Sequence, residues 1–320
     1  MGERMGADRV VGIDENGLGP RLGPLVVTAV VAEITGDGAS VALGPPSGHM
    51  AERIGDSKAL VSHGDVALGE AWARAIAARM GSSPEAPDGL FTELSLDDPG
   101  ELLRCCPDHV RAQCWGVEGE RFEANEELVR RVAGDLAELD ALGVRILGAR
   151  TAVVCTKKLN DALALGRSRL DVDLHEMERL VLHAASRTPG ALSAVCGKVG
   201  GYTYYEKAFG PLAGRLHTTI VESAERSAYH FPSIGTIAFV RDADASHLVV
   251  ALASLVGKWV RELLMARIVR YYGADGAAHR ASGYHDPVTA RFVEATADAR
   301  LSLRVSDDCF ERASEPHEPA

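Results

Sequence analysis

Two adjacent acids, Asp14 and Glu15, stand at the end of the first apolar run of the chain, Val10–Ile13. Adjacent residues of a strand face opposite sides, so both carboxylates can reach one metal ion only where the strand ends. Gly17 and Gly19 follow and give the backbone the freedom to turn there. Hard oxygen ligands of this kind suit Mg²⁺ or Mn²⁺. The pair predicts a divalent metal site, and the alternative is a strand-to-turn junction whose acids are merely solvated.

A second acidic site follows the apolar run Thr236–Val240, which predicts another strand. Asp242 and Asp244 lie between this strand and a long helix that we predict from about residue 246 to residue 272. Capping is a strong alternative here, because Asp is a preferred N-cap and an acid is favoured at a helix N-terminus.

Distance along the predicted helix separates its other charged residues from that junction. Glu262 lies eighteen positions beyond Asp244. This is roughly 27 Å along a continuous helix, so the two cannot bind one metal cluster. Lys258 and Arg261 are similarly remote. We interpret all three as packing or pairing residues, with contact to a nucleic-acid backbone as the lesser alternative.

Composition indicates a globular protein of enzyme size. The chain has 320 residues, 46% hydrophobic and 25% charged, with a formal net charge of −11. This charge argues against broad attraction to phosphate backbones, so any nucleic-acid contact must come from a local basic surface. We expect a soluble, cytoplasmic protein without a membrane partner, since no apolar run is long enough for a bilayer span or a secretion signal. The six cysteines contain no Cys-x-x-Cys pair, so we expect reduced thiols and no structural zinc.

The order of apolar periodicities predicts a mixed α/β sheet. A hairpin comes first, and helices and strands then alternate. Residues 34–49 and 82–100 are polar or rich in Gly and Pro and predict connections. The predicted strands are 10–13, 25–33, 145–155, 191–196, 201–206, 216–222 and 235–240, and the predicted helices are 65–81, 118–142, 171–186 and 246–272.

Four short motifs are spread along the chain. They are Asp14-Glu15-x-Gly-x-Gly-Pro, Gly23-Pro24-Leu25-Val26-Val27, Asp56-Ser57-Lys58, and Asp244 followed by the run from Val250 to Lys258. In order and separation they resemble the motifs of ribonucleases HII and HIII, the type 2 ribonucleases H. The similarity runs from about residue 9 to residue 272, which we take as a catalytic domain. Residues 273–312 would form a helical extension and residues 313–320 a disordered tail.

The resemblance implies a fold and a function. The fold is a ribonuclease H-like mixed β-sheet flanked by helices, and it presents four acids to two Mg²⁺ or Mn²⁺ ions. The activity is cleavage of the RNA strand of an RNA–DNA hybrid. Asp14, Glu15 and Asp244 take three of the four acidic places, as metal ligands and catalytic residues. Such a metal pair activates a water and stabilises the leaving oxygen.

Two positions depart from the family pattern. The family places its remaining acid at the end of a central strand, where this chain has Gly197. Glu222, Glu225 or Asp242 are candidates to replace it. The second departure is Leu18, where ribonuclease HII has a basic residue. These departures leave an alternative function, a ribonuclease H-like protein that binds nucleic acid without cutting it.

Further residues are candidates for substrate binding. The turn Gly17–Gly19, with Leu18 at its centre, offers backbone N–H groups, and Lys58 belongs to the third motif. Lys198 and Tyr202 belong to a Gly-rich segment that interleaves basic and aromatic residues, a pattern that suits a single strand. A strand with half-buried tyrosines explains that pattern equally well.

Two residues outside the motifs have simpler explanations: Asn160 and Asp286 are predicted helix caps rather than site residues. His247 is the histidine closest in sequence to Asp244, and it is the one histidine that we would test as a helper near the metal site.

Overall fold

The computed structural model describes residues 8–55, 60–61, 63–106, 113–187, 190, 192–273 and 280–314. Its centre is a mixed seven-stranded sheet with the order β3-β2-β1-β4-β7-β6-β5. β1, β4 and β7 are parallel to one another, and every other neighbouring pair is antiparallel. The strands are β1 (Asp8–Asn16), β2 (Leu25–Ile34), β3 (Val144–Val154), β4 (Leu192–Gly197), β5 (Thr218–Glu222), β6 (Arg226–Phe231) and β7 (Gly235–Val240).

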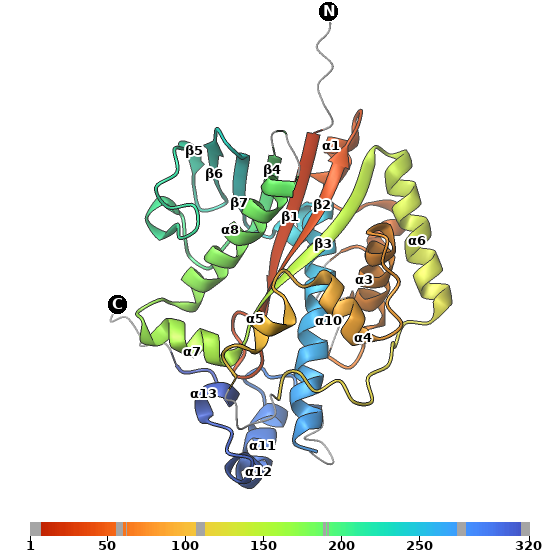
Figure 1. Ribbon diagram of the computed structural model, residues 1–320. Coiled ribbons are helices and arrows are strands. Elements are labelled where there is room, and N and C mark those ends of the chain that lie inside the picture. Colours follow the sequence, from red (N-terminus) through yellow and green to blue (C-terminus); the bar gives the residue numbers. More distant parts are fainter. Residues whose placement is uncertain are drawn as a thin grey trace, which may run out of the picture.

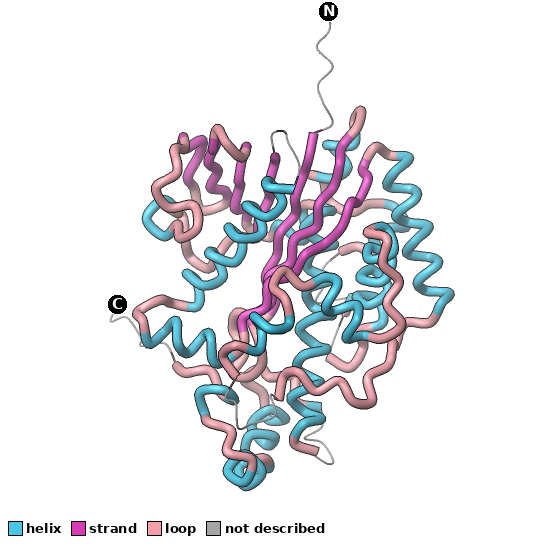
Figure 2. Tube along the Cα trace, in the orientation of Figure 1, coloured by secondary structure: helices cyan, strands magenta, loops and turns pink. Residues whose placement is uncertain are grey.

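Helices cover both faces of this sheet, and Figure 1 shows α8 and α10 on opposite sides of the central strands. α3, α6 and α10 share one core with the sheet, and α7 and α8 share the other. Figure 2 shows the helices wrapped around the strands. The helices are α1 (Gly38–Ala42), α3 (Ala67–Arg79), α4 (Pro87–Leu94), α5 (Pro99–Leu103), α6 (Glu126–Ala141), α7 (Thr156–Ala164), α8 (Arg169–Arg187), α9 (Ala243–Ser246), α10 (Leu248–Tyr271), α11 (Pro287–Ala295), α12 (Ala297–Ser302) and α13 (Asp307–Phe310), with short 3₁₀ turns η1 (Gly48–Glu52) and η2 (Glu206–Ala208).

Close packing of β1 against α10 sets the position of the first acid. A Cβ added to Gly12 would lie 2.3 Å from the backbone carbon of Val249, so only glycine permits this approach. Alternation along β1 then directs Val10 and Asp14 toward α10, and Val11 and Ile13 toward α8. The parallel strands β1, β4 and β7 end at the same edge of the sheet, where the predicted acids also lie.

The predicted α/β fold class is confirmed: the structure has a mixed sheet with helices on both faces. The C-terminal extension is helical, as α11, α12 and α13. It packs on the far end of α10, where Met265, Phe292 and Phe310 share a small core. The domain boundaries stay a prediction, and residues 315–320 of the predicted tail lie outside the described residues.

Two strand predictions need correction. The segment 201–206 is irregular rather than a strand: Gly200 has φ +48° and the N–H of Tyr202 closes a turn onto the carbonyl of Val199. The ring of Tyr205 instead stacks on Phe239 at a centroid distance of 3.9 Å. The second correction is β6, which the sequence analysis missed.

The predicted helix 246–272 corresponds to α10, which begins two residues later, at Leu248. The short helix α9 precedes it as a separate element, because His247 between them is extended (φ −136°, ψ 115°). The predicted helix 118–142 starts later, at Glu126, since the side chain of Asn125 caps it by accepting from the N–H of Leu128. The predicted connections 34–49 and 82–100 contain the short helices α1, α4 and α5. In the described part of the chain, no helix is long and apolar enough to cross a membrane.

Candidate active site

The acids predicted from the sequence meet at one open cavity, which we call the acid cavity. Asp14, Glu15 and Asp244 all line it, and its volume is about 290 Å³. It lies where β1, β4 and β7 end, because the carboxyl ends of parallel strands share one edge of a sheet. Its lining residues are Asp14, Glu15, Asn16, Gly17, Leu18, Gly19, Gly197, Lys198, Asp242, Ala243, Asp244, Ser254, Lys258 and Tyr284.

Asp14 lies in an electrostatically unfavourable environment. Its side chain is buried, with 8% of the residue exposed. Burial raises the pKa of Asp14 well above its ordinary value, and the charges of Glu15 and Asp244 raise it further. A hydrogen bond with Ser254 opposes this rise. The negative charges at this edge therefore repel one another, and a bound cation would relieve that repulsion.

Gly197 lies where another acid would join this group. A Cβ on Gly197 would stand 2.9 Å from Asp14 Oδ1 and 3.4 Å from Glu15 Oε2. Both contacts are with the ends of flexible side chains, so a larger residue fits if those carboxylates shift slightly. Because position 197 is glycine, no carboxylate lies at this position beside Asp14 and Glu15.

Of the three candidate replacements, Asp242 is the one that reaches the acid cavity. Asp242 has a left-handed backbone (φ +48°), and its side chain caps no N–H group of the described helix α9. Glu222 instead accepts a hydrogen bond from the hydroxyl of Tyr229. Glu225 pairs with Arg241 at 2.7 Å on the surface. Glu222 and Glu225 therefore have other partners, and neither lines the acid cavity.

A further acid, Asp173 on α8, lies close to this edge and was missed in the sequence analysis. It is fully buried, and its two carboxylate oxygens have no hydrogen-bond partner among the described residues. Burial raises its pKa well above the ordinary value, and the charges of Glu15 and Asp14 add to the rise. The sequence carried a signal, since Asp173 shares a helical stripe with the buried Met177 and Leu180.

The described acids are not arranged as a complete set of ligands for one metal ion. Across the described ranges, no group of three or more His, Cys, Asp or Glu side chains is arranged to hold a metal ion. The donor chemistry nevertheless suits a hard divalent cation, because every acid of the cavity offers carboxylate oxygens.

The Gly17–Gly19 turn forms another wall of the acid cavity, and the C-terminal extension holds it in place. Gly17 has φ +91°, a conformation that favours glycine. Arg312 is buried and donates to the carbonyls of Gly17 at 2.7 Å, Leu18 at 3.1 Å and Gly23 at 2.8 Å. Sequence analysis missed this role, because Arg312 lies almost 300 residues from the turn that it fixes.

Basic and aromatic groups border the acids. Lys198 lines the cavity and donates to the carbonyl of Ser223 at 2.8 Å. Lys258 lines it as well, so the cavity extends from Asp244 to a residue fourteen positions further along the chain.

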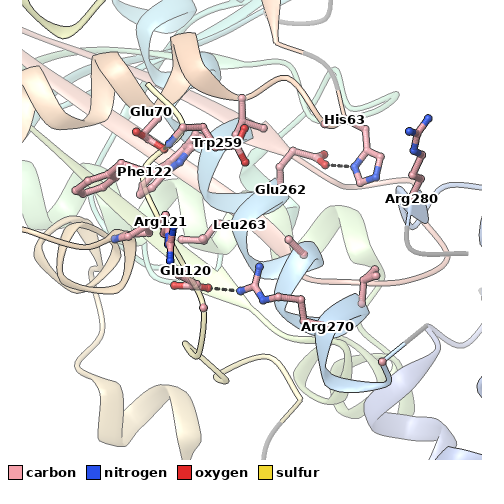
Figure 3. A pocket seen from close by; sticks show the side chains of 18 residues that line it. His63, Glu70, Glu120, Arg121, Phe122, Trp259, Glu262, Leu263, Arg270 and Arg280 are labelled. Carbon is pink, nitrogen blue, oxygen red and sulfur yellow. Dashed lines mark hydrogen bonds and ion pairs between the residues drawn. The ribbon is translucent and has the colours of Figure 1, made fainter. Parts of the chain in front are cut away.

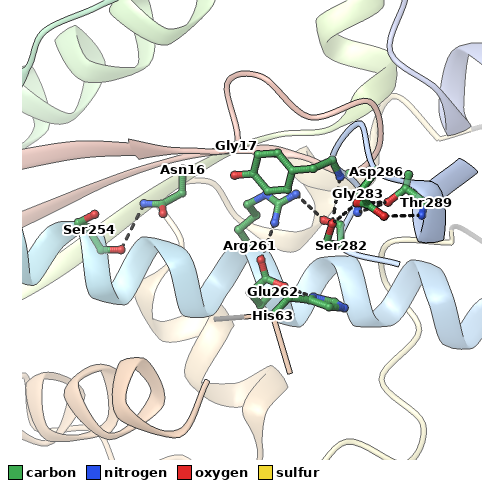
Figure 4. Close-up of polar contacts among 12 residues, drawn as sticks. Asn16, Gly17, His63, Ser254, Arg261, Glu262, Ser282, Gly283, Asp286 and Thr289 are labelled. Carbon is green, nitrogen blue, oxygen red and sulfur yellow. Dashed lines mark hydrogen bonds and ion pairs between the residues drawn. The ribbon is translucent and has the colours of Figure 1, made fainter. Parts of the chain in front are cut away.

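Tyr284 also lines the acid cavity and is 47% exposed. The guanidinium of Arg261 lies 4.6 Å from the centre of its ring. Arg261 in turn donates to the carbonyl of Ser282 and pairs with Glu262 (Figure 4). The sequence analysis did not identify Tyr284 and predicted only a helix cap at Asp286 nearby. The cap is confirmed, since Asp286 accepts from two N–H groups at the start of α11.

Several predicted residues lie elsewhere. Tyr202 does not line the acid cavity, and its hydroxyl donates to Asp171 at 2.7 Å. Asn160 lies inside α7 rather than at its cap, and its amide binds the carbonyls of Asp308 and Glu311. The motif Asp56-Ser57-Lys58, with the predicted binding residue Lys58, lies outside the described residues.

His247, the predicted helper, is half-buried, and its Nδ1 lies 2.9 Å from the hydroxyl of Ser246. Burial lowers the pKa of His247. It is not among the residues that line the acid cavity.

A larger cavity, of about 990 Å³, lies along α10 and contains none of the predicted site residues (Figure 3). Two of its acids have basic partners. Glu262 binds His63 at 2.5 Å, and Glu120 binds Arg267 and Arg270 at 2.7 and 2.6 Å. A third, Glu70, has a pKa raised by burial and, to a smaller extent, by the charge of Glu123.

No protein-family model and no curated protein matches the chain. Among solved structures, the chain is similar to the ribonuclease HII of Archaeoglobus fulgidus, solved in complex with PCNA, at a TM-score of 0.44 and 15% identity over 97% of each chain. It is also similar to the ribonuclease H2 of Pyrococcus horikoshii OT3, at a TM-score of 0.42 and 14% identity over 94% of this chain and 92% of that one. A third similar structure is Bst-RNase HIII in complex with Mn²⁺, at a TM-score of 0.41 and 15% identity over 97% of this chain and 67% of that one. These proteins belong to the ribonuclease classes that the sequence motifs resemble.

Proposed function

We propose that this protein is a metal-dependent endoribonuclease that hydrolyses the RNA strand of RNA–DNA hybrids. The observation that carries the proposal is the meeting of Asp14, Glu15 and Asp244 at one open cavity. These residues are far apart in the sequence, and they are the acids that the ribonuclease H resemblance assigns to catalysis.

In this proposal Asp14, Glu15 and Asp244 hold Mg²⁺ or Mn²⁺. Two such ions, when bound, supply an activated water and stabilise the leaving 3′-oxygen in an in-line displacement. The raised pKa of Asp14 supports a cation at this place, since burial and like charges destabilise its ionised form in the absence of one. Asp242 is the replacement for the missing acid that the lining of the cavity supports best.

The rest of the cavity is suited to a nucleic-acid strand. Lys198 and Lys258 offer positive charge for phosphates, although the protein as a whole is acidic. The exposed ring of Tyr284 offers a flat surface for a sugar or base. Selection of RNA over DNA requires groups that contact the 2′-hydroxyl, and backbone N–H groups of the Gly17–Gly19 turn are our candidates.

A second candidate function is binding of the hybrid without cleavage. Gly197 favours it specifically, because it leaves no carboxylate at the end of β4, beside Asp14 and Glu15. Under this alternative, the fold and the basic groups would still bind the nucleic acid, but the protein would not hydrolyse it.

Cleavage of a labelled RNA–DNA hybrid separates these two functions. The assay is run beside duplex DNA and duplex RNA, in Mg²⁺ and in Mn²⁺, with Asp14→Asn as the matched control. We expect cleavage of the hybrid alone, lost in the variant. Intact binding of the hybrid without cleavage in either metal would establish the binding function instead. Cleavage that persists in Asp14→Asn would show that the acid cavity is not the catalytic site.

A further inference from the structure

A second cavity is lined mainly by thiols, and we call it the thiol pocket. Five of the six cysteines of the chain line this small space of about 30 Å³. They come from three distant parts of the sequence: the segment after α5, the junction of β3 with α7, and α13 in the C-terminal extension. The five are Cys105, Cys106, Cys114, Cys155 and Cys309. All are free thiols in the structure, as the sequence analysis expected.

Cys105 and Cys155 form a close thiol pair inside this pocket. Their sulfur atoms lie 3.3 Å apart. A disulfide bond has a sulfur–sulfur length of about 2.05 Å, so a small movement of the side chains would join them. The two residues are separated by 50 positions of chain, and Cys155 is the N-cap residue of α7.

Cys105 also faces solvent on its other side. It lines an open surface cavity of about 280 Å³ together with Arg104, Lys158 and Arg179. Asp97 and Glu101 complete the lining. Cys155 is buried behind Cys105, with 7% of its surface exposed. A small oxidant can therefore reach Cys105 more readily than Cys155.

The surroundings favour a thiolate at Cys105. Hydrogen bonds with Cys106 and Cys155 lower the pKa of Cys105, burial opposes this, and the positive charge of Lys158 lowers it further. The same contact with Cys105 and its own burial raise the pKa of Cys155. A reactive thiolate beside a buried partner thiol is the arrangement of peroxide-reactive cysteines.

A metal ion is the alternative occupant of the thiol pocket. Zinc at about 2.3 Å from each thiolate holds its sulfurs roughly 3.8 Å apart in a tetrahedral shell. The Cys105 and Cys155 sulfurs, at 3.3 Å, would have to move apart to bind it. Within the ranges that the structure describes, no group of three or more potential ligands is arranged to hold a metal.

We propose that Cys105 and Cys155 form a disulfide when the protein meets hydrogen peroxide. The Cys105 thiolate attacks one peroxide oxygen, the O–O bond breaks, and the products are a sulfenic acid and, after protonation, water. The Cys155 sulfur then attacks the Cys105 sulfur, its proton leaves, and the hydroxyl group departs as a second water. In total, two thiols lose two electrons and two protons, and one peroxide becomes two waters. This site does not depend on the proposed nuclease function.

Peptide mapping of the whole protein tests this proposal. The reduced protein is treated with a small excess of hydrogen peroxide, free thiols are alkylated, and trypsin cuts after Arg104, Arg111, Arg150 and Lys157. Cys155 is then the only cysteine of one peptide, and Cys105 and Cys106 lie together on another. We expect these two peptides joined, with the loss of two hydrogens, and fragmentation placing the bond on Cys105.

Three variants make the result specific. Cys155→Ser should abolish the joined peptide and leave Cys105 as a sulfenic acid that a dimedone probe traps. Cys106→Ser and Cys196→Ser should retain the joined peptide, because neither sulfur takes part in the bond, and Cys196 lies outside the thiol pocket.

Two outcomes would overturn the proposal. One is the formation of a disulfide between a different pair of cysteines in the wild-type protein, or the absence of any disulfide while the thiols can still be alkylated. The other is a metal ion bound to the thiols of the freshly purified protein, detected by native mass spectrometry and released when thiols are blocked. That result would make the thiol pocket a metal site.

Discussion

Two buried acids that lie along α10, Glu262 and Asp14, have opposite surroundings. In the larger cavity, Glu262 is buried beside Arg261 and His63. Burial alone would raise the pKa of Glu262, but these two partners lower it below the ordinary value. In the acid cavity, burial and neighbouring acids raise the pKa of Asp14. The chain supplies a basic partner in the first region, and we propose that a bound metal ion supplies the positive charge in the second.

The largest expected effect is on cleavage. Asp244→Asn keeps the size of the side chain but removes a charge that faces Asp14. We expect hybrid cleavage to fall by about 10²–10³-fold, the usual cost of losing one electrostatic group at the reacting centre. Glu225→Gln is the matched control, because Glu225 pairs with Arg241 outside the acid cavity. Equal rates for the two variants would contradict the assignment of Asp244.

The paired region should respond in stability instead. Glu262→Gln leaves Arg261 buried without its carboxylate partner. We expect the free energy of unfolding to fall by about 3 kcal/mol, as for other broken buried ion pairs. Glu127→Gln, which breaks an exposed pair with Arg131, should change it by less than about 1 kcal/mol. Urea denaturation measures both changes. An unchanged free energy of unfolding in Glu262→Gln would show that the ion pair with Arg261 does not stabilise the fold.

Restoring an acid at Gly197 sharpens the comparison further. Gly197→Asp places a carboxylate beside Asp14 and Glu15. We expect Mn²⁺ to bind about tenfold more tightly, a gain of about 1.4 kcal/mol. Gly134→Asp is the control, since Gly134 lies exposed on α6 with open space around it. Calorimetric titration with Mn²⁺ gives both affinities, and equal values would mean that position 197 is not part of the metal site.

The smallest expected effect is a pair of opposite pH dependences, measured without divalent metal. The folded-state pKa of Asp14 is raised, so its stabilising contribution is complete below its unfolded value near 3.8 and is lost as pH rises through the folded value. Asp14→Asn should therefore gain stability relative to wild type with rising pH, by about 1 kcal/mol.

Glu262 should show the reverse. Its folded-state pKa is lowered, so its contribution is complete above its unfolded value near 4.5 and is lost as pH falls through the folded value. The cost of Glu262→Gln should shrink in that acidic range. Thermal melts of the three proteins across pH give both slopes, and slopes of the same sign would remove the distinction between the two regions.

The sequence alone predicted those parts of the fold and the candidate site in which a short motif lies at the end of a regular strand or helix. The strand ending in Asp14-Glu15 and the apolar α10 follow from local periodicity, and the parallel strands then bring Asp14 and Asp244 to one edge. The irregular segment 201–206 was mistaken for a strand, because its tyrosines have the right residue type. Tertiary packing of Tyr205 on Phe239 decided its structure.

Contacts between distant segments could not be predicted from one sequence. Arg312 meets the Gly17–Gly19 turn, and Cys155 meets Cys105, only because the C-terminal extension and α7 fold against the sheet as they do. Asp173 is an intermediate case. Its place on the buried stripe of α8 was visible in the helical period, but its proximity to Glu15 was not.

The central claim is that the acids of the acid cavity bind a divalent cation. Mn²⁺ binding followed by electron paramagnetic resonance, on wild-type protein and on Asp14→Asn, tests it most directly. We predict that wild-type protein binds Mn²⁺ and that Asp14→Asn loses this binding while it remains folded. Equal Mn²⁺ binding by the two proteins, or none by wild type, would contradict the claim.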